Sequence, residues 1–161
     1  CTPHAIAFDG FRWHARAWCH ERAEFRDFVL ARMLAVAEAK PATDLGAADA
    51  EWHRCVTLRI APNPALPPDH RRAIESDYGM TDGELRIETR ISQVFYFEAL
   101  HSLDLKPSAV PPQRQQIVLL NRDKVTRAQA DAKQAARSAL AERGVHALFA
   151  ASDDAAGSNA D

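Results

Sequence analysis

An Asp-Gly pair at Asp9 and Gly10 is the feature that most constrains the fold of this chain. It separates two segments typical of β-strands, the apolar run His4–Phe8 and the alternating run Phe11–Cys19. Asp-Gly between such segments is a strong signal for a β-hairpin. Alternation along the second strand predicts one face with Trp13, Ala15 and Ala17, and an opposite face with Arg12, His14, Arg16 and Trp18.

Residues 3–32 also concentrate cations and aromatic rings. The arginines are Arg12, Arg16, Arg22, Arg26 and Arg32, and Trp13 and Trp18 lie among them. Guanidinium groups pair with phosphates through two parallel hydrogen bonds and stack on flat rings, so this pattern favours a site for a flat anion. The alternative is an ordinary charged surface whose arginines pair with Asp9, Glu21, Glu24 and Asp27. Spacing alone leaves both interpretations open.

Composition limits the classes of protein that fit this chain. A length of 161 residues suits one ordinary domain or two small ones, and 47% apolar with 26% charged residues is normal for a soluble globular protein. The net charge of -2 means that any contact with nucleic acid must come from a local patch. No apolar run approaches the ~18 residues of a membrane span. Cys1, Cys19 and Cys55 follow no disulfide pattern, which favours a reducing cytoplasm.

The remaining elements are predicted from the spacing of apolar residues and from the glycines and prolines that end helices and strands. Glu24–Phe28 is expected as a helical turn, and Val29–Ala37 as a strand or a helix. Ala39–Ala50 has the composition of a linker. The second half predicts an α+β sandwich, in the order strand Trp52–Ala61, helix Asp69–Tyr78 ending at Gly79, strand Glu84–Arg90, helix Ile91–Leu103, strand Gln116–Leu120 and helix Lys124–Ala150, before a disordered end at Ser152–Asp161.

The helix Ile91–Leu103 carries three consecutive aromatic residues, Phe95, Tyr96 and Phe97. Such a stripe usually packs in a core. In a small domain, part of it is also suited to a dimer face. The sequence does not choose between the two.

Motifs for catalysis and metal binding are missing from the sequence. It contains no G-x-S-x-G, P-loop, G-x-G-x-x-G or H-E-x-x-H motif. Asp77 and Asp82 flank Tyr78-Gly79-Met80, and this pattern is more typical of a helix end followed by a turn than of a catalytic pair of carboxylates. Cys19 and His20 have no second ligand pair at zinc-finger spacing. We therefore expect no enzyme, no cofactor and no metal site.

Three blocks of the chain resemble WYL-domain transcriptional regulators, and most closely a subgroup of bacterial phage-defence repressors. The blocks are PHAIAFDGFRWHARAWC with FRDFVLAR, RIAPNPALPPDHRRAIESDYGM, and QQIVLLN, within residues 1–122. The Trp-Tyr-Leu that names the family corresponds to Trp13-His14-Ala15 here. The resemblance implies a winged helix-turn-helix domain, a WYL domain with an Sm-like (SH3-type) β-barrel, and a C-terminal α/β extension called WCX. Since the chain begins at Cys1 inside a predicted strand, we expect the winged helix and the opening barrel strands to lie upstream.

The resemblance also implies a site and partners. The basic face of the WYL barrel is expected to bind an anionic effector, nucleic acid or an oligonucleotide, through His14, Arg16, Arg26 and Arg32, with Arg12 and His4 as further candidates. Trp13 is assigned to packing. Operator DNA would be bound only through the absent N-terminal domain, and the WCX part would form a homodimer in the cytoplasm, away from membranes.

Together these inferences predict a mixed α+β chain: a truncated barrel at residues 1–38, a linker at 39–51, a WCX dimerisation domain at 52–122 and a helical, partly disordered tail at 123–161. We predict that the chain is the effector-sensing and dimerising portion of a bacterial transcriptional regulator, and that this regulator acts as a repressor. Two alternatives stay open: a dimerisation module without a ligand, and a non-specific nucleic-acid-binding domain.

Overall fold

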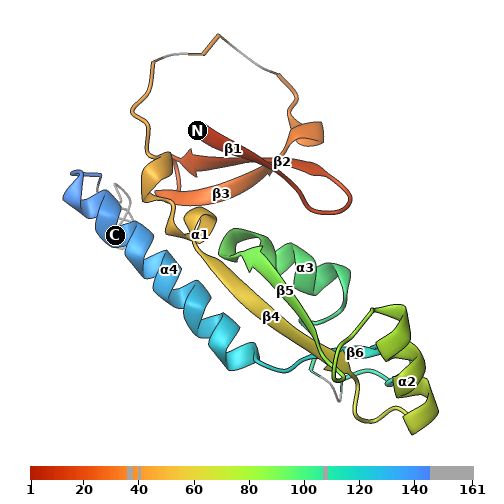
Figure 1. Ribbon diagram of the computed structural model, residues 1–161. Coiled ribbons are helices and arrows are strands. Elements are labelled where there is room, and N and C mark those ends of the chain that lie inside the picture. The colour runs from red at the N-terminus through yellow and green to blue at the C-terminus, as the bar shows by residue number, and fades with distance from the viewer. Residues whose placement is uncertain (36–37, 40, 107–108, 146–161) are drawn as a thin grey trace, which may run out of the picture. The chain divides into compact units, whose positions relative to one another are not determined.

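A computed structural model describes residues 1–35, 38–39, 41–106 and 109–145 of the chain. The described residues form two compact units. Among the described residues, the first unit contains residues 1–49 and 136–145, and the second contains residues 50–135. Both units contain an antiparallel sheet with three strands, so the expected mixed α+β class is confirmed (Figure 1).

The sheet of the first unit has the order β1-β2-β3, with β1 at Thr2–Phe8, β2 at Trp13–Cys19 and β3 at Glu24–Val29. The hairpin expected at Asp9 is confirmed, because Phe8 pairs with Trp13 across the turn. The turn is closed by Asp9, whose side chain accepts hydrogen bonds from the backbone N–H groups of Phe11 and Arg12. Gly10 adopts a φ of 95°, which glycine tolerates without a steric cost.

Two expectations for this unit are wrong. Glu24–Phe28 is a strand and not a helical turn, because β3 pairs along its length with β2 and places Phe25 opposite the buried Trp18. Such cross-strand pairing outweighs local propensity. Within Val29–Ala37, Val29 is the last residue of β3 and Leu30–Arg32 is a 3-10 helix (η1), while residues 36 and 37 lie outside the described residues.

The described residues also contain no barrel. β1 and β3 are the two edges of an open sheet. A barrel closes only when its first and last strands pair, and three short strands are too few for that. The described part of residues 1–38 therefore forms a three-stranded antiparallel sheet, where a partial barrel was expected.

The segment expected as a linker, Ala39–Ala50, contains a second 3-10 helix (η2) at Gly46–Ala48. The short helix α1, Ala50–His53, opens the second unit, so Trp52 is helical and does not begin a strand. Leu45 and Asp49 are buried, which a solvated linker would not show. Lys40 lies outside the described residues.

The sheet of the second unit has the order β5-β4-β6, and both neighbours run antiparallel to β4. Its strands and helices follow the predicted order, with boundaries shifted by a few residues. They are β4 (Cys55–Pro62), α2 (Pro68–Asp77), β5 (Leu85–Arg90), η3 (Ile91–Gln93) with α3 (Val94–Leu100), β6 (Ile117–Leu119) and α4 (Arg122–Glu142).

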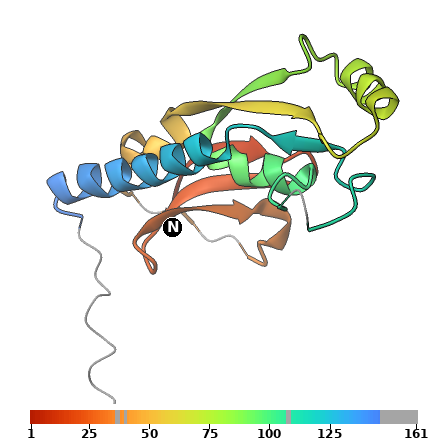
Figure 2. The ribbon, with the colours of Figure 1, turned by 90° about the horizontal axis from the view of Figure 1, so that it is seen from below.

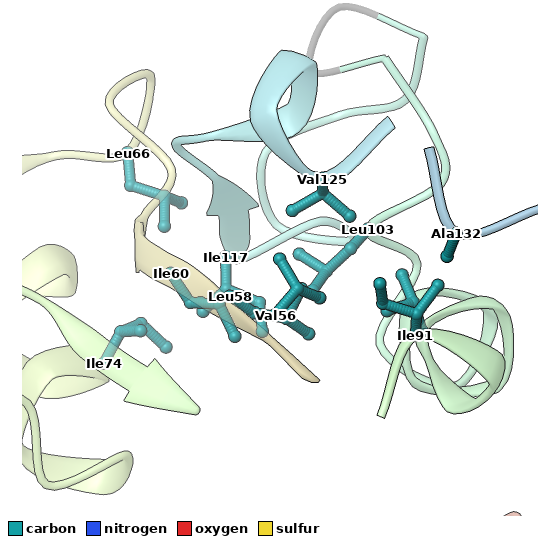
Figure 3. Packing of buried hydrophobic residues seen from close by; sticks show 11 residues of the cluster. Val56, Leu58, Ile60, Leu66, Ile74, Ile91, Leu103, Ile117, Val125 and Ala132 are labelled. Carbon is teal, nitrogen blue, oxygen red and sulfur yellow. The ribbon is translucent and has the colours of Figure 1, made fainter. Parts of the chain in front are cut away.

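The core of the second unit forms on one face of β4. Val56, Leu58 and Ile60 are buried while the alternate residues are exposed, as the sequence alternation predicts. Figure 3 shows these three side chains gathered with residues from the other elements of the unit. The remaining members are Leu66, Ile74, Ile91, Val94, Leu103, Ile117, Val125 and Ala132. One continuous core therefore joins β4, β6, α2, α3 and the first turns of α4.

Helix α4 has 21 residues and is the longest helix in the part of the chain that is described (Figure 2). It begins two residues before the predicted helix Lys124–Ala150 and ends at Glu142. The expectation of disorder at Ser152–Asp161 concerns residues outside those described. Among the described helices, none is both long and apolar enough to cross a membrane.

Candidate functional site

Arg16 lies at the centre of a buried ionic cluster in the first unit. It is 4% exposed, on the face of β2 that the sequence alternation assigned to it. Its guanidinium donates two hydrogen bonds to the carboxylate of Asp49, from Nε to Oδ2 at 2.7 Å and from Nη2 to Oδ1 at 3.0 Å. Its Nη1 lies 3.6 Å from Oδ2 of Asp27, the residue that pairs with Arg16 across β2 and β3. Burial of this cation is therefore offset by two carboxylates.

His4 joins the same cluster through Asp49. Its Nε2 lies 3.0 Å from Oδ2 of Asp49, whose side chain is completely buried. His4 sits where the register between β1 and β2 shifts, which turns its ring out of the regular alternation. Its ring also meets the edge of Phe25, with centroids 5.6 Å apart.

The segment 44–49 is held against β1 by a close backbone approach. A Cβ atom on Gly46 would lie 2.7 Å from Cβ of His4, closer than two such carbons approach, so only glycine fits there. The N–H of Gly46 donates to Oδ1 of Asp44 at 2.9 Å. Gly46 and Asp44 therefore place the segment so that Asp49 reaches Arg16.

A second ionic cluster surrounds Asp9 in the β1–β2 turn. Nε2 of His14 lies 2.7 Å from Oδ2 of Asp9, and Nη2 of Arg12 lies 3.4 Å from the same oxygen. Burial raises the pKa of Asp9, but the hydrogen bonds from the Arg12 backbone, the His14 side chain and the Phe11 backbone outweigh it and hold the pKa well below its ordinary value. Asp9 is consequently ionised at neutral pH.

The other two candidates lie apart from these clusters. Arg26 pairs with Ala17 across the sheet, so it points to the face opposite Arg16, and it forms an exposed ion pair with Glu24 at 3.2 Å. Arg32 is exposed at the end of η1. The six candidates thus divide into three buried or half-buried residues, His4, His14 and Arg16, and three residues with accessible guanidinium groups, Arg12, Arg26 and Arg32.

The face of this sheet opposite Arg16, onto which Arg26 points, is otherwise largely apolar and is partly open. A cavity of about 440 Å³ lies against it, lined by residues that include Pro3, Ile6, Ala15, Phe28, Leu30 and Met33. Trp13 lies on the same face and is 55% exposed, with its ring 5.1 Å from that of Phe8. The expectation that Trp13 is a packing residue is wrong for this chain, because nothing in the described residues covers more than part of its ring.

Two residues of the site, Asp49 and Gly46, were not predicted from the sequence. Asp49 lies 33 residues from Arg16, in a segment with linker composition, and no local pattern connects the two. Gly46 is one of several glycines in polar segments. Its closeness to His4 arises from the tertiary structure and has no local sequence signal. The described residues contain no group of three or more His, Cys, Asp or Glu side chains suited to hold a metal ion.

Comparison with known families accounts for both units. Residues 1–38 match the WYL domain, and residues 55–125 match the C-terminal dimerization domain of the BrxR transcriptional regulator. The chain combines a WYL domain with a BrxR-type C-terminal dimerization domain. The resemblance found in the sequence is thereby confirmed.

Curated relatives of this chain are longer proteins. The chain is 42% identical to a DNA-binding transcriptional repressor CapW of Stenotrophomonas maltophilia, across 77% of this chain and 42% of the relative. It is 36% identical to proteins of the same description from Escherichia coli and Pseudomonas aeruginosa, with the same coverage. The chain is homologous to these CapW repressors and spans less than half of their length. The relatives are repressors and not enzymes, in agreement with the absence of catalytic motifs from the sequence.

Proposed function

We propose that this chain is the effector-sensing and dimerising portion of a bacterial transcriptional repressor, and that its WYL domain binds a negatively charged ligand such as an oligonucleotide. The observation that carries the proposal is the 42% identity to a CapW repressor across 77% of this chain. Operator DNA is then bound by a further domain, and the repressor acts as a homodimer in the cytoplasm.

The accessible cations are the first candidates for contact with the ligand. The Arg12 and Arg26 side chains are 38% and 43% exposed, and Arg32 is exposed as well. Exposed ion pairs such as Arg26 with Glu24 contribute only about 0–1 kcal/mol, so a phosphate competes with the carboxylate at little cost. Guanidinium groups bind phosphate through two parallel hydrogen bonds.

Arg16, His14 and His4 lie on the face of the sheet opposite Arg26 and form a second, buried part of the proposed site. An anion that reached Arg16 would compete with Asp49 for the guanidinium. Asp49 directly precedes α1, the first element of the second unit. Displacement of Asp49 therefore supplies a physical route from ligand binding to the dimerising unit. The ligand shifts the repressor only by its difference in affinity between the two states.

A second candidate function is a dimerisation module without a ligand. It is favoured by the burial of His14 and Arg16 against Asp9, Asp27 and Asp49, since these carboxylates already pair with the two side chains. In that case the arginine-rich sequence serves the fold of the first unit.

The proposal also includes the β-barrel that is typical of WYL domains, with β1, β2 and β3 as part of its wall. The apolar cavity and the exposed rings of Phe8 and Trp13 on one face of the sheet support it, because such a face is suited to a barrel interior. Enclosure of Trp13 in a longer polypeptide is its testable consequence.

Binding of short single-stranded oligonucleotides tests the ligand proposal. Fluorescence anisotropy of labelled oligonucleotides would be measured with the chain, with the Arg26→Ala/Arg32→Ala variant, and with Arg127→Ala, which removes one positive charge from the exposed surface of α4, as a control. We expect the double variant to weaken binding at least tenfold and Arg127→Ala to leave it unchanged. The same double variant in a full-length repressor would then fail to release promoter DNA when oligonucleotide is added.

The outcomes separate the alternatives. Equal binding by all three proteins, with a steep salt dependence and no preference for length, indicates a non-specific nucleic-acid binder. No binding by the chain, together with normal regulation by the full-length double variant, supports the ligand-free dimerisation module.

A further inference from the structure

Helix α3 turns two different faces toward core and solvent. Val94 is fully buried, and Phe97 packs against the core of the second unit. Phe95 and Leu100, by contrast, are 67% and 60% exposed. Residues three and four apart share a helix face, so Ala99, which is also exposed, lies beside Phe95. Leu100 follows Ala99 at the C-terminal end of the helix, so the exposed apolar residues Phe95, Ala99 and Leu100 span about 140° of the helix circumference. These three residues define the outer face of α3.

The outer face contains no charged residue of its own, unlike the exposed surfaces of α2 and β5. The carboxylate that borders it, Glu98, is 15% exposed and lies 3.9 Å from Nη1 of Arg122. The exposed residues of α2 include Asp69 and Arg72, and those of β5 are Arg86, Glu88 and Arg90. Exposed apolar side chains that gather on one element mark an interaction surface more often than scattered ones do. Phe95 also has a fixed aromatic neighbour, since its ring meets the edge of Tyr96 at 5.4 Å. Aromatic side chains are enriched at the centres of protein interfaces.

We propose that the outer face of α3 is the surface through which two copies of this chain associate. The proposal rests on the homodimer of the proposed function and names its contact. Residues 55–125 match a family described as a dimerization domain, and α3 lies within that range. In a two-fold dimer the same patch meets itself, and an uncharged patch does so without repulsion between like charges.

The size of the surface defines its role in the interface. A standard interface buries roughly 800 Å² on each partner, more than three side chains supply. The outer face of α3 is thus the apolar centre, and polar residues around it form the rim. Truncation at such a centre weakens association far more than truncation at the rim.

The oligomeric state of the 161-residue chain and its variants tests this surface. Sedimentation velocity would be measured over a range of concentrations for the chain, for Phe95→Glu and for Leu100→Glu. The matched control is Tyr78→Glu, which places the same charge on an aromatic residue 36% exposed at the end of α2. We expect each α3 variant to raise the dimer dissociation constant by about 30-fold or more, and the control to leave it unchanged. Circular dichroism of each variant checks that its fold is kept.

A cross-link provides evidence that does not depend on a disruptive substitution. In a Cys1→Ser/Cys55→Ser background, Ala99→Cys is expected to form a disulfide-linked dimer under mild oxidation, whereas Cys introduced at the exposed Ser76 of α2 is not. A dimer that survives Phe95→Glu and Leu100→Glu without cross-linking at residue 99 overturns the surface and leaves the proposed homodimer standing. A chain that is monomeric at all concentrations overturns both.

Discussion

At the scale of single residues, Asp49 is the counterion on which the first unit depends. It is completely buried and accepts hydrogen bonds from Arg16, while His4 lies 3.0 Å from its Oδ2. Removal of one partner from a buried ion pair leaves a desolvated charge and costs more than the pair itself contributes. We expect Asp49→Ala to lower the free energy of unfolding by about 3 kcal/mol, measured by urea denaturation.

The exposed pair of Arg26 and Glu24 provides the matched control for Asp49. Both side chains are about two-fifths exposed, so Glu24→Ala is expected to change stability by less than about 1 kcal/mol. Equal effects of Asp49→Ala and Glu24→Ala would show that the cluster around Arg16 is solvated in solution.

The pKa of Asp9 predicts an acid-sensitive turn. Its pKa lies below the ordinary value of 3.8 in the folded protein, so the stability that it contributes is present above about pH 4 and is lost as the pH falls further. We expect the difference in unfolding free energy between the chain and Asp9→Asn to shrink as the pH falls below about 4. Urea denaturation at each pH measures it. A difference that stays constant down to pH 3 would contradict the assignment.

The side-chain orientations in β2 could be predicted from the sequence, but their burial could not. Alternation correctly placed His14, Arg16 and Trp18 on one face of β2. It did not indicate that this face is buried, because the carboxylate that permits burial of Arg16 comes from Asp49, distant in sequence. Burial of a charge depends on its partner, and the partner is a tertiary property.

At the scale of elements, the two tryptophans of β2 are expected to differ in their contribution to stability. Trp18 is 4% exposed and packs on Phe25, whereas Trp13 is 55% exposed. In this chain Trp18→Ala should lower the free energy of unfolding by about 3–5 kcal/mol, and Trp13→Ala by no more than about 1 kcal/mol. Thermal unfolding followed by circular dichroism compares them.

The same pair tests the proposed barrel. In a full-length protein whose WYL barrel encloses residue 13, Trp13→Ala should become as costly as Trp18→Ala. If Trp13→Ala stays mild in the longer protein, the apolar face of the sheet is not a barrel interior.

Elements differed in how well the sequence predicted them. β4 and β5 alternate cleanly, and α2 has prolines at its start and Gly79 after its end, so their patterns are local. β3 has no comparable pattern and owes its conformation to pairing with β2. Propensity decides an element only where no partner strand competes with it.

At the scale of the whole molecule, the chain consists of a WYL unit rich in buried ionic contacts and a dimerization unit with a continuous apolar core. The division suits a sensor and an assembly part joined at residues 49 and 50. Under the proposed function, the ligand acts on the first unit and the dimer is held by the second.

The sequence by itself determined the mixed α+β class, the hairpin at Asp9, the order of elements in the second unit and the family. Each of these depends on local periodicity, turn residues or a contiguous block of matching residues. The tertiary structure alone decided that Arg16 is buried against Asp49, that Trp13 is exposed, and that Phe97 faces the core while Phe95 faces solvent. These are contacts between residues far apart in the chain, or orientations set by such contacts. A local sequence pattern does not predict them, because it depends only on neighbouring residues.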